Sequence, residues 1–136
     1  MADISADIRA ILELQVAQIP QVPSVAWENV SFAPTTGQSY LQVSYLPISR
    51  EPAVRGLQPV QRYDILLSIN CYAPEGSGPS VADNLAKNVI GSFEATNSLT
   101  NQNNLTVRIE RAERLEGILD SPWYFVPVNI YCYCYN

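Results

Sequence analysis

The sequence predicts a single α/β domain of the α+β kind, in which one mixed or antiparallel sheet carries an N-terminal helix, a second helix and a long C-terminal hairpin. Three patterns lead to this prediction. Apolar and polar residues alternate over residues 63–71, which is the period of a half-buried strand. After a Pro/Gly turn, apolar residues recur at every fourth position from Val81 to Phe93, as on one helix face. Two strand-like apolar runs, separated by turn residues, end the chain.

The first part of the chain predicts a helix followed by two strands. Asp3 or Ser5 can cap the helix, which ends before Pro20. Its apolar face consists of Ile4, Ile8, Ile11 or Leu12, and Ile19. A short strand is expected at residues 27–32, and a second one at residues 40–47, where apolar and polar residues alternate.

Residues 48–60 lose this alternation. Pro52, Gly56 and Pro59 interrupt the segment, and its length exceeds the usual hairpin loop of about 2–5 residues. The segment is therefore either an arm with a function or a solvated surface loop. If it is an arm, its charged residues are the candidate partner-docking site. They are Arg50, Glu51 and Arg55.

The second part of the chain predicts a strand, a helix and a hairpin. A strand that begins at Gln61 is followed by a helix over residues 79–95, with a proline at its first position. A strand that begins at Leu105 runs into a mixed-charge segment, and turn residues then lead into the last strand, residues 123–135. Because proline cannot donate to a strand ladder, we expect a bulge near Pro127.

The mixed-charge segment of this hairpin is the candidate subunit interface. Both signs are interleaved, which suits contacts between copies of the chain better than a patch of one sign. The alternative is a solvated surface, since exposed salt bridges are usually worth only about 0–1 kcal/mol. The candidate residues are Arg108, Glu110, Arg111, Glu113, Arg114 and Glu116.

One core is expected between the sheet and the helices. Its predicted members are Leu67, Ile69, Val107, Ile109, Val128 and Ile130, with the helix face Val81, Leu85, Val89 and Phe93. The last strand is apolar on both faces, and we interpret its stripe of tyrosines as structural in preference to a binding cage. The three cysteines, Cys71, Cys132 and Cys134, are expected to be reduced and packed in the core.

Composition excludes several classes of function. The 136 residues fit one domain, 1–136. The chain has 13 acidic and 8 basic residues and thus a net charge of −5, which argues against static binding of nucleic acid. The chain has no histidine, so it cannot assemble a Ser-His or Cys-His nucleophile, and no phosphate-binding loop is present. We therefore predict no enzyme activity, no catalytic residues, no metal site and no cofactor. Without a signal peptide or membrane span, we expect a soluble protein made in a cytoplasm.

Four short phrases follow one another along nearly the whole chain: Val25-Ala26-Trp27-Glu28-Asn29-Val30, Tyr40-Leu41-Gln42-Val43, Arg62-Tyr63-Asp64-Ile65 and Ser121-Pro122-Trp123-Tyr124. With these phrases, the order of the predicted elements resembles that of the tail terminator proteins of long-tailed bacteriophages. None of these phrases is a chemical motif, so the resemblance rests on their order and on the size of the chain.

The resemblance implies a small α/β domain that assembles as a hexameric ring on the finished tail tube. Such a ring is a structural part of the virion: it stops tube polymerisation and offers an attachment surface to head-completion proteins. Its implied partners are further copies of the chain, the tail tube protein and a head-completion or connector protein, with DNA only in transit and no membrane. The alternative is another neck or head-completion protein, which would share the size and the oligomerisation.

Overall fold

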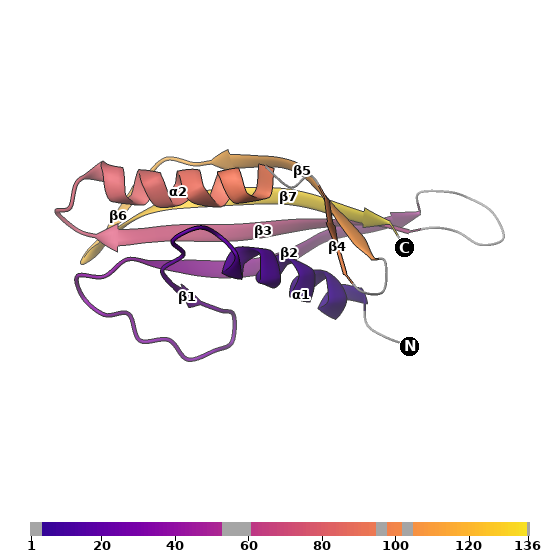
Figure 1. Ribbon diagram of the computed structural model, residues 1–136, viewed down its shortest axis with the longest axis horizontal. Helices are drawn as coiled ribbons and strands as arrows, with labels where there is room; N and C mark the ends of the chain where they lie inside the picture. Colours follow the sequence, from indigo (N-terminus) through magenta and orange to yellow (C-terminus); the bar gives the residue numbers. More distant parts are fainter. Residues whose placement is uncertain (1–3, 53–60, 95–97, 102–104, 136) are drawn as a thin grey trace.

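The computed structural model describes residues 4–52, 61–94, 98–101 and 105–135 and shows two helices and a seven-stranded sheet (Figure 1). The elements in chain order are α1 (Ile4–Ala17), β1 (Ser24–Ala26), β2 (Tyr40–Pro52), β3 (Gln61–Pro74), α2 (Pro79–Glu94), β4 (Ser98–Thr100), β5 (Thr106–Arg114), β6 (Ile118–Asp120) and β7 (Trp123–Tyr135). This confirms the predicted α+β class, with an N-terminal helix and C-terminal strands.

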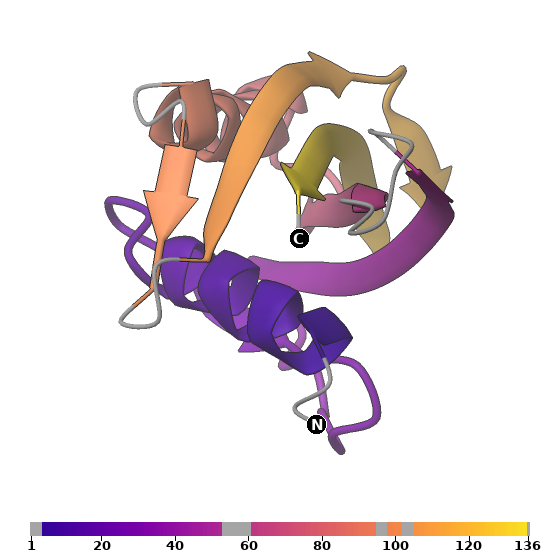
Figure 2. The ribbon, with the colours of Figure 1, turned by 90° about the vertical axis from the view of Figure 1, so that its right-hand side faces the viewer.

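The sheet is mixed and strongly curled. Its order is β1-β2-β3-β7-β5-β4, and β6 pairs with β7 beyond the end of β5. All pairings are antiparallel except that of β1 with β2. Viewed along the strands, the sheet bends around the two helices, which lie on the same side (Figure 2). The central place of β7 explains why its sequence is apolar on both faces.

The core lies between the helices and one face of the sheet. The buried strand residues include the predicted Leu67, Ile69, Val107, Val128 and Ile130, together with Cys71, Cys132 and Cys134. From α1 (Ile4–Ala17), Ile8, Ile11 and Leu12 of the predicted face are buried, and Ile19 is buried just after the helix has ended. The alternation of the sequence therefore assigned the buried face of the sheet correctly, because successive side chains in a strand point to opposite faces.

The buried face of α2 is rotated from the predicted one. Val89 and Phe93 are buried as expected, but Val81 and Leu85 are only half-buried, and the fully buried positions of the first turns are Ala82 and Ala86. A spacing of four residues advances about 40° beyond a full turn at each step. Four apolar residues with this spacing therefore cannot all lie on the buried face of the helix.

Three further expectations are corrected by the structure. The short strand lies at Ser24–Ala26 and not at residues 27–32. The strand predicted to end at residue 47 continues to Pro52, after a bulge between Pro47 and Ser49. No bulge occurs at Pro127, which pairs with Asn70 in a continuous β3–β7 ladder.

The backbone geometry explains why Pro127 is tolerated in the centre of the sheet. The carbonyl of Pro127 accepts a bond from Leu115 N at 2.9 Å, so this residue directs its polar backbone side away from β3. Its missing N–H therefore falls where β5 has ended at Arg114 and β6 has not yet begun at Ile118. The ladder to β3 loses no hydrogen bond.

A second, aromatic cluster lies on the opposite face of the sheet, at the end where β7 begins. Tyr40 and Tyr72 stack with ring centroids 4.5 Å apart, and Trp123 meets Tyr40 edge-on at 5.2 Å. Phe125 stacks on Tyr72 at 4.7 Å. Burial raises the pKa of both tyrosines above the ordinary value. The aromatic residues at this end of β7 are thus structural, as the sequence predicts.

Candidate assembly surfaces

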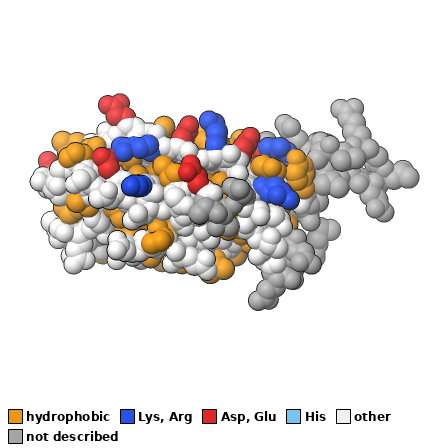
Figure 3. Space-filling view, turned by 45° about the horizontal axis from the view of Figure 1, so that its top comes forward, with side chains coloured by type: hydrophobic (Ala, Val, Ile, Leu, Met, Phe, Trp, Pro, Cys, Tyr) orange, Lys and Arg blue, Asp and Glu red, His pale blue; other side chains and the backbone are white. Residues whose placement is uncertain are grey.

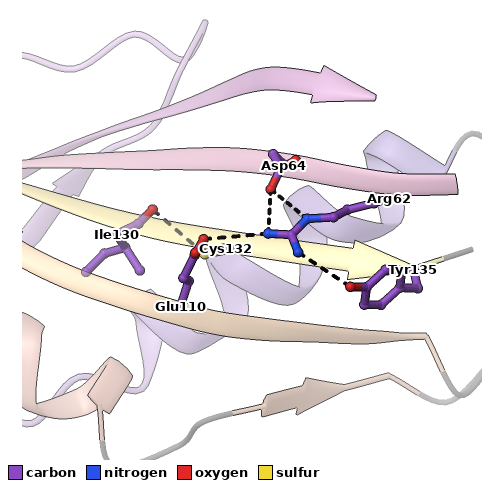
Figure 4. Close-up of polar contacts among 6 residues, drawn as sticks. All are labelled: Arg62, Asp64, Glu110, Ile130, Cys132 and Tyr135. Carbon is purple, nitrogen blue, oxygen red and sulfur yellow. Dashed lines mark hydrogen bonds and ion pairs between the residues drawn. The ribbon is translucent and has the colours of Figure 1, made fainter. Parts of the chain in front are cut away.

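The outer face of the sheet carries a network centred on Arg62 in β3 (Figure 4). The Arg62 guanidinium donates to Asp64 Oδ1 from Nε at 3.1 Å, and Nη2 lies 3.0 Å from the same oxygen. It also reaches Glu110 of β5 at 3.7 Å and the Tyr135 hydroxyl of β7 at 3.4 Å. The guanidinium carbon lies 4.3 Å from the ring centroid of Tyr133. The Arg62 guanidinium therefore contacts side chains from three strands, β3, β5 and β7.

The environment of Arg62 keeps it charged. Its hydrogen bond to Asp64 is the largest cause that raises its pKa above the ordinary value, and the bond to Tyr135 adds to the effect. Since Arg62 faces two carboxylates, Asp64 and Glu110, the network has no surplus of positive charge. It fixes the geometry of the outer face, and it does not attract an anion.

A second arginine–tyrosine unit lies beside the first. The Arg111 guanidinium carbon lies 4.1 Å from the Tyr131 ring centroid, and Nη1 lies 3.5 Å from Glu113 Oε2. The Tyr131 hydroxyl donates to Glu113 Oε1 at 3.1 Å. Two aromatic rings on the outer face of β7, Tyr131 and Tyr133, are thus each covered by an arginine.

A bulge in β5 brings these charges to the outer face. The register shifts between Ile109 and Arg111, so Glu110 is the extra residue. Before the bulge, Ile109 pairs with the buried Cys132; after it, Arg111 pairs with Tyr131 and Ala112 with the buried Ile130. Without the extra residue, Arg111 would point into the core. The bulge therefore lets an apolar strand continue into a charged one without burying an arginine.

The six predicted interface residues are placed unequally. Glu110, Arg111 and Glu113 belong to the two networks just described. Arg114 forms an ion pair with Asp83 of α2 at 2.8 Å. Arg108 and Glu116 are exposed and make no ion pair with any residue that the structure describes. Charges of both signs lie interspersed on this side of the molecule (Figure 3).

The first part of the predicted arm, residues 48–52, belongs to β2, and residues 53–60 lie outside the described residues. The backbone of Arg50 and Glu51 belongs to β2, paired with Tyr63 and Arg62. Arg55 lies outside the described residues. The end of β2 and the start of β3 lie at the end of the molecule where the C-terminus also lies, opposite the end that carries β6 (Figure 1).

The outer edge of β2 is blocked against further strand pairing. Residues 40–42 of β2 pair with β1, and farther along the same edge the Tyr45 N–H donates a hydrogen bond to the Glu28 carboxylate. That N–H points away from β3, and two residues on, Pro47 has no N–H on the same side. Prolines and capped donors on an edge are devices that prevent edge-to-edge association. Pro52 falls on this side as well, given the register after the bulge.

The three cysteines lie in the core, as the sequence predicts. All three cysteines are free and buried, and burial raises the pKa of Cys71 and of Cys132 to about 12, so these thiols stay protonated near neutral pH. Among the residues that the structure describes, no group of three or more His, Cys, Asp or Glu is placed to hold a metal ion. No helix in the same part of the chain is both long and apolar enough to cross a membrane.

Sequence reasoning missed the role of Arg62, Asp64 and the tyrosines that surround them. The aromatic stripe of the last strand was recognisable, but its arginine partners come from other strands. Their contact depends on the pairing Arg62↔Tyr135 and Asp64↔Tyr133 between β3 and β7. No local pattern in the sequence signals that register.

Comparison with known proteins assigns the family. The family model described as "Phage tail terminator protein" matches residues 7–131. The search among curated proteins found no match. One solved structure shares 24% sequence identity and the same fold, with a TM-score of 0.68 over 95% of this chain and 93% of its own. The chain belongs to the phage tail terminator family, and the protein is therefore a structural component of the phage tail.

Proposed function

We propose that the protein forms a ring that caps the phage tail tube, stops tube polymerisation and provides the attachment surface for the head. The observation that carries this proposal is the family match over residues 7–131. The partners of the ring are further copies of the chain, with a hexamer as the expected state, the tail tube protein and a head-completion protein. Assembly takes place in the host cytoplasm. The net charge of −5 disfavours retention of DNA, which meets the ring only in transit.

The β2–β3 hairpin supports a docking role for the arm. Arg50 and Glu51 lie near the end of β2, where they pair with Tyr63 and Arg62 of β3, so the arm begins at this margin of the sheet. We propose that the arm, residues 48–60, contacts the tail tube or the adjoining head-side ring, with Arg50, Glu51 and Arg55 as contact residues. Arginine presents a planar fork of donors that matches partner carboxylates.

Replacement of the arm tests this role. Since residues 51 and 52 belong to β2, the variant replaces residues 53–58 with a Gly-Ser linker of equal length. A phage that lacks its terminator is complemented with this variant and its tails are imaged. We expect a folded protein and overlong tubes without heads. A control replaces residues 35–38, an exposed turn closed by Gln38 N and Thr35 O, and should give normal tails. Normal tails from the arm variant would refute a docking role for Arg55 and the rest of residues 53–58.

We propose further that the mixed-charge strand β5 contacts a neighbouring subunit, through the segment 108–116. Several of its charges are already paired within the chain, so Arg108, which is exposed and has no described ion-pair partner, is the sharpest position to test. Native mass spectrometry of Arg108→Glu should show a lower oligomeric state than the wild-type protein. Lys87→Glu, an exposed charge reversal on α2, is the matched control and should leave the oligomer intact. An unchanged oligomer in Arg108→Glu removes this residue from the interface.

A further inference from the structure

Helix α1 has apolar residues on the side that faces away from the sheet. Leu14 is 62% exposed, and the other exposed positions over residues 6–17 are alanines, Ala6, Ala10 and Ala17. A surface helix usually carries charged or polar residues on its outward side, and a helix that is apolar on both sides is usually covered on both. Within the part of the chain that the structure describes, the outward side of α1 is uncovered.

Glu13 borders this outward side and has no ion-pair partner among the described residues. It is half-buried, and it follows Ala10 by three residues, so the two side chains are neighbours on the helix surface. Arg9 is the only basic residue of α1, and it pairs with Glu28 at 3.4 Å. The other carboxylate, Asp7, lies in the first turn, where the helix dipole favours a negative charge. Glu13 lacks both kinds of support.

The outer face of the sheet carries an apolar row that no described helix covers. Leu46 of β2 pairs with Leu66 of β3, and Leu66 pairs with Tyr131 of β7. Their neighbours along each strand are buried in the core, so these three side chains point to the other face. Leu46 is 47% exposed, and Leu66 and Tyr131 are half-buried. Both helices lie on the opposite side of the sheet (Figure 2).

The apolar row ends at arginines of β5. Arg111 is the ladder partner of Tyr131, lies over its ring and is already paired with a carboxylate of the chain. Arg108 is the ladder partner of Tyr133, in the next outward-facing row. It is exposed and makes no ion pair with any described residue. A positive charge without a partner thus borders the row, as the negative charge of Glu13 borders the helix, and the two surfaces are complementary.

The two surfaces also match in length. From Ala6 to Ala17, α1 rises roughly 17 Å at about 1.5 Å per residue. From Leu46 to Arg111 the row crosses three spacings between strands, roughly 14 Å at about 4.8 Å each. Because the surfaces lie on opposite sides of the sheet, one copy can offer its helix while its own row receives the helix of the next copy. Such a heterologous contact can repeat until a ring closes.

We propose that the outward side of α1 packs on the outer sheet face of a second copy of this chain, with Leu14 on the apolar row and Glu13 paired with Arg108. This inference rests on the proposed function and deepens it, since it names the two surfaces that join neighbouring subunits of the ring. A different virion protein is a poorer occupant, because this chain itself carries both the apolar and the charged halves of the contact.

Cross-linking tests the contact directly. The variant Leu14→Cys/Leu46→Cys is treated with a short bismaleimide, as the purified protein and in complemented phage particles, and is analysed on denaturing gels. We expect covalent multimers. The native cysteines are buried, so the wild-type protein should give none. The control Leu14→Cys/Ile118→Cys places the second thiol in β6, at a residue of the same exposure as Leu46, 47%, and should also give none.

A charge swap tests the pairing of Glu13 with Arg108. In a phage that lacks its terminator, we expect overlong tubes from Arg108→Glu and from Glu13→Arg. The double variant Arg108→Glu/Glu13→Arg should restore normal tails, because it re-forms the pair with the signs exchanged. The control Arg108→Glu/Glu94→Arg has the same net charge, with the second reversal at an exposed residue of α2, and should not restore them.

Absence of multimers in both preparations, or equal amounts from the Ile118 control, would overturn the proposal, because α1 and the apolar row would then not be in contact. Normal tails from Arg108→Glu alone, or no rescue by Glu13→Arg, would overturn the charge pair. The proposed function fails by a different result: tails of normal length, joined to heads, in a phage that makes no copy of this chain. Multimers of the purified double-cysteine variant would still establish the contact in that case.

Discussion

The packing of α2 on the sheet gives a quantitative prediction for Phe93→Ala and Leu85→Ala. Phe93 has no exposed surface, whereas Leu85 is half-buried at the margin of the core. Removal of a fully buried phenylalanine ring costs about 3–5 kcal/mol of the free energy of unfolding. For Leu85 we expect roughly 1–2 kcal/mol, below the range for fully buried leucines, because part of the side chain is already in contact with water.

The assay is urea unfolding followed by far-UV circular dichroism, at one fixed protomer concentration, since oligomerisation adds to the apparent stability. Asn84→Ala is the control: Asn84 is exposed on the same helix, and the change should alter the free energy of unfolding by less than about 0.5 kcal/mol. A loss for Leu85→Ala as large as that for Phe93→Ala would mean that α2 presents the face with strict four-residue spacing. The buried positions Ala82 and Ala86 would then be wrong, and so would the explanation by helical drift.

Three further predictions follow from the cysteines, a glycine and the blocked edge. In the native protein at pH 8, Cys71 and Cys132 should not react with a thiol reagent, whereas all cysteines should react in urea. Burial raises the folded-state pKa of these two thiols to about 12, above the unfolded value, so the stability that they contribute is complete below about pH 9 and is lost as the pH rises toward 12. Melting temperatures measured as a function of pH test this loss. Gly117→Ala should cost about 1–3 kcal/mol in urea unfolding, since the phenol of Tyr124 must move; a neutral effect would contradict the close packing. Pro47→Val restores an N–H on the outer edge of β2 and should produce larger species in size-exclusion chromatography as concentration rises, which an unchanged profile would refute.

The sequence by itself determined the elements with a strong local period. The helix predicted at residues 79–95 is present as α2, and the last strand has the predicted bounds, 123–135. The buried face of β3 and β7 was also assigned correctly, down to Cys71, Cys132 and Cys134. These features depend on alternation along a strand and on the start and stop signals of a helix, which are properties of neighbouring residues.

Only the tertiary structure decided how the charged residues are used. The extension of β2 through Pro52 depends on β3 alongside it, and Pro47 is tolerated because its side of the strand faces outward. The partners of Arg62 come from β5 and β7, and the bulge at Glu110 turns Arg111 outward. Such contacts join residues far apart in the chain, so their register is set by strand pairing and packing. A local pattern specifies which face of a strand is buried, but not which strand lies beside it.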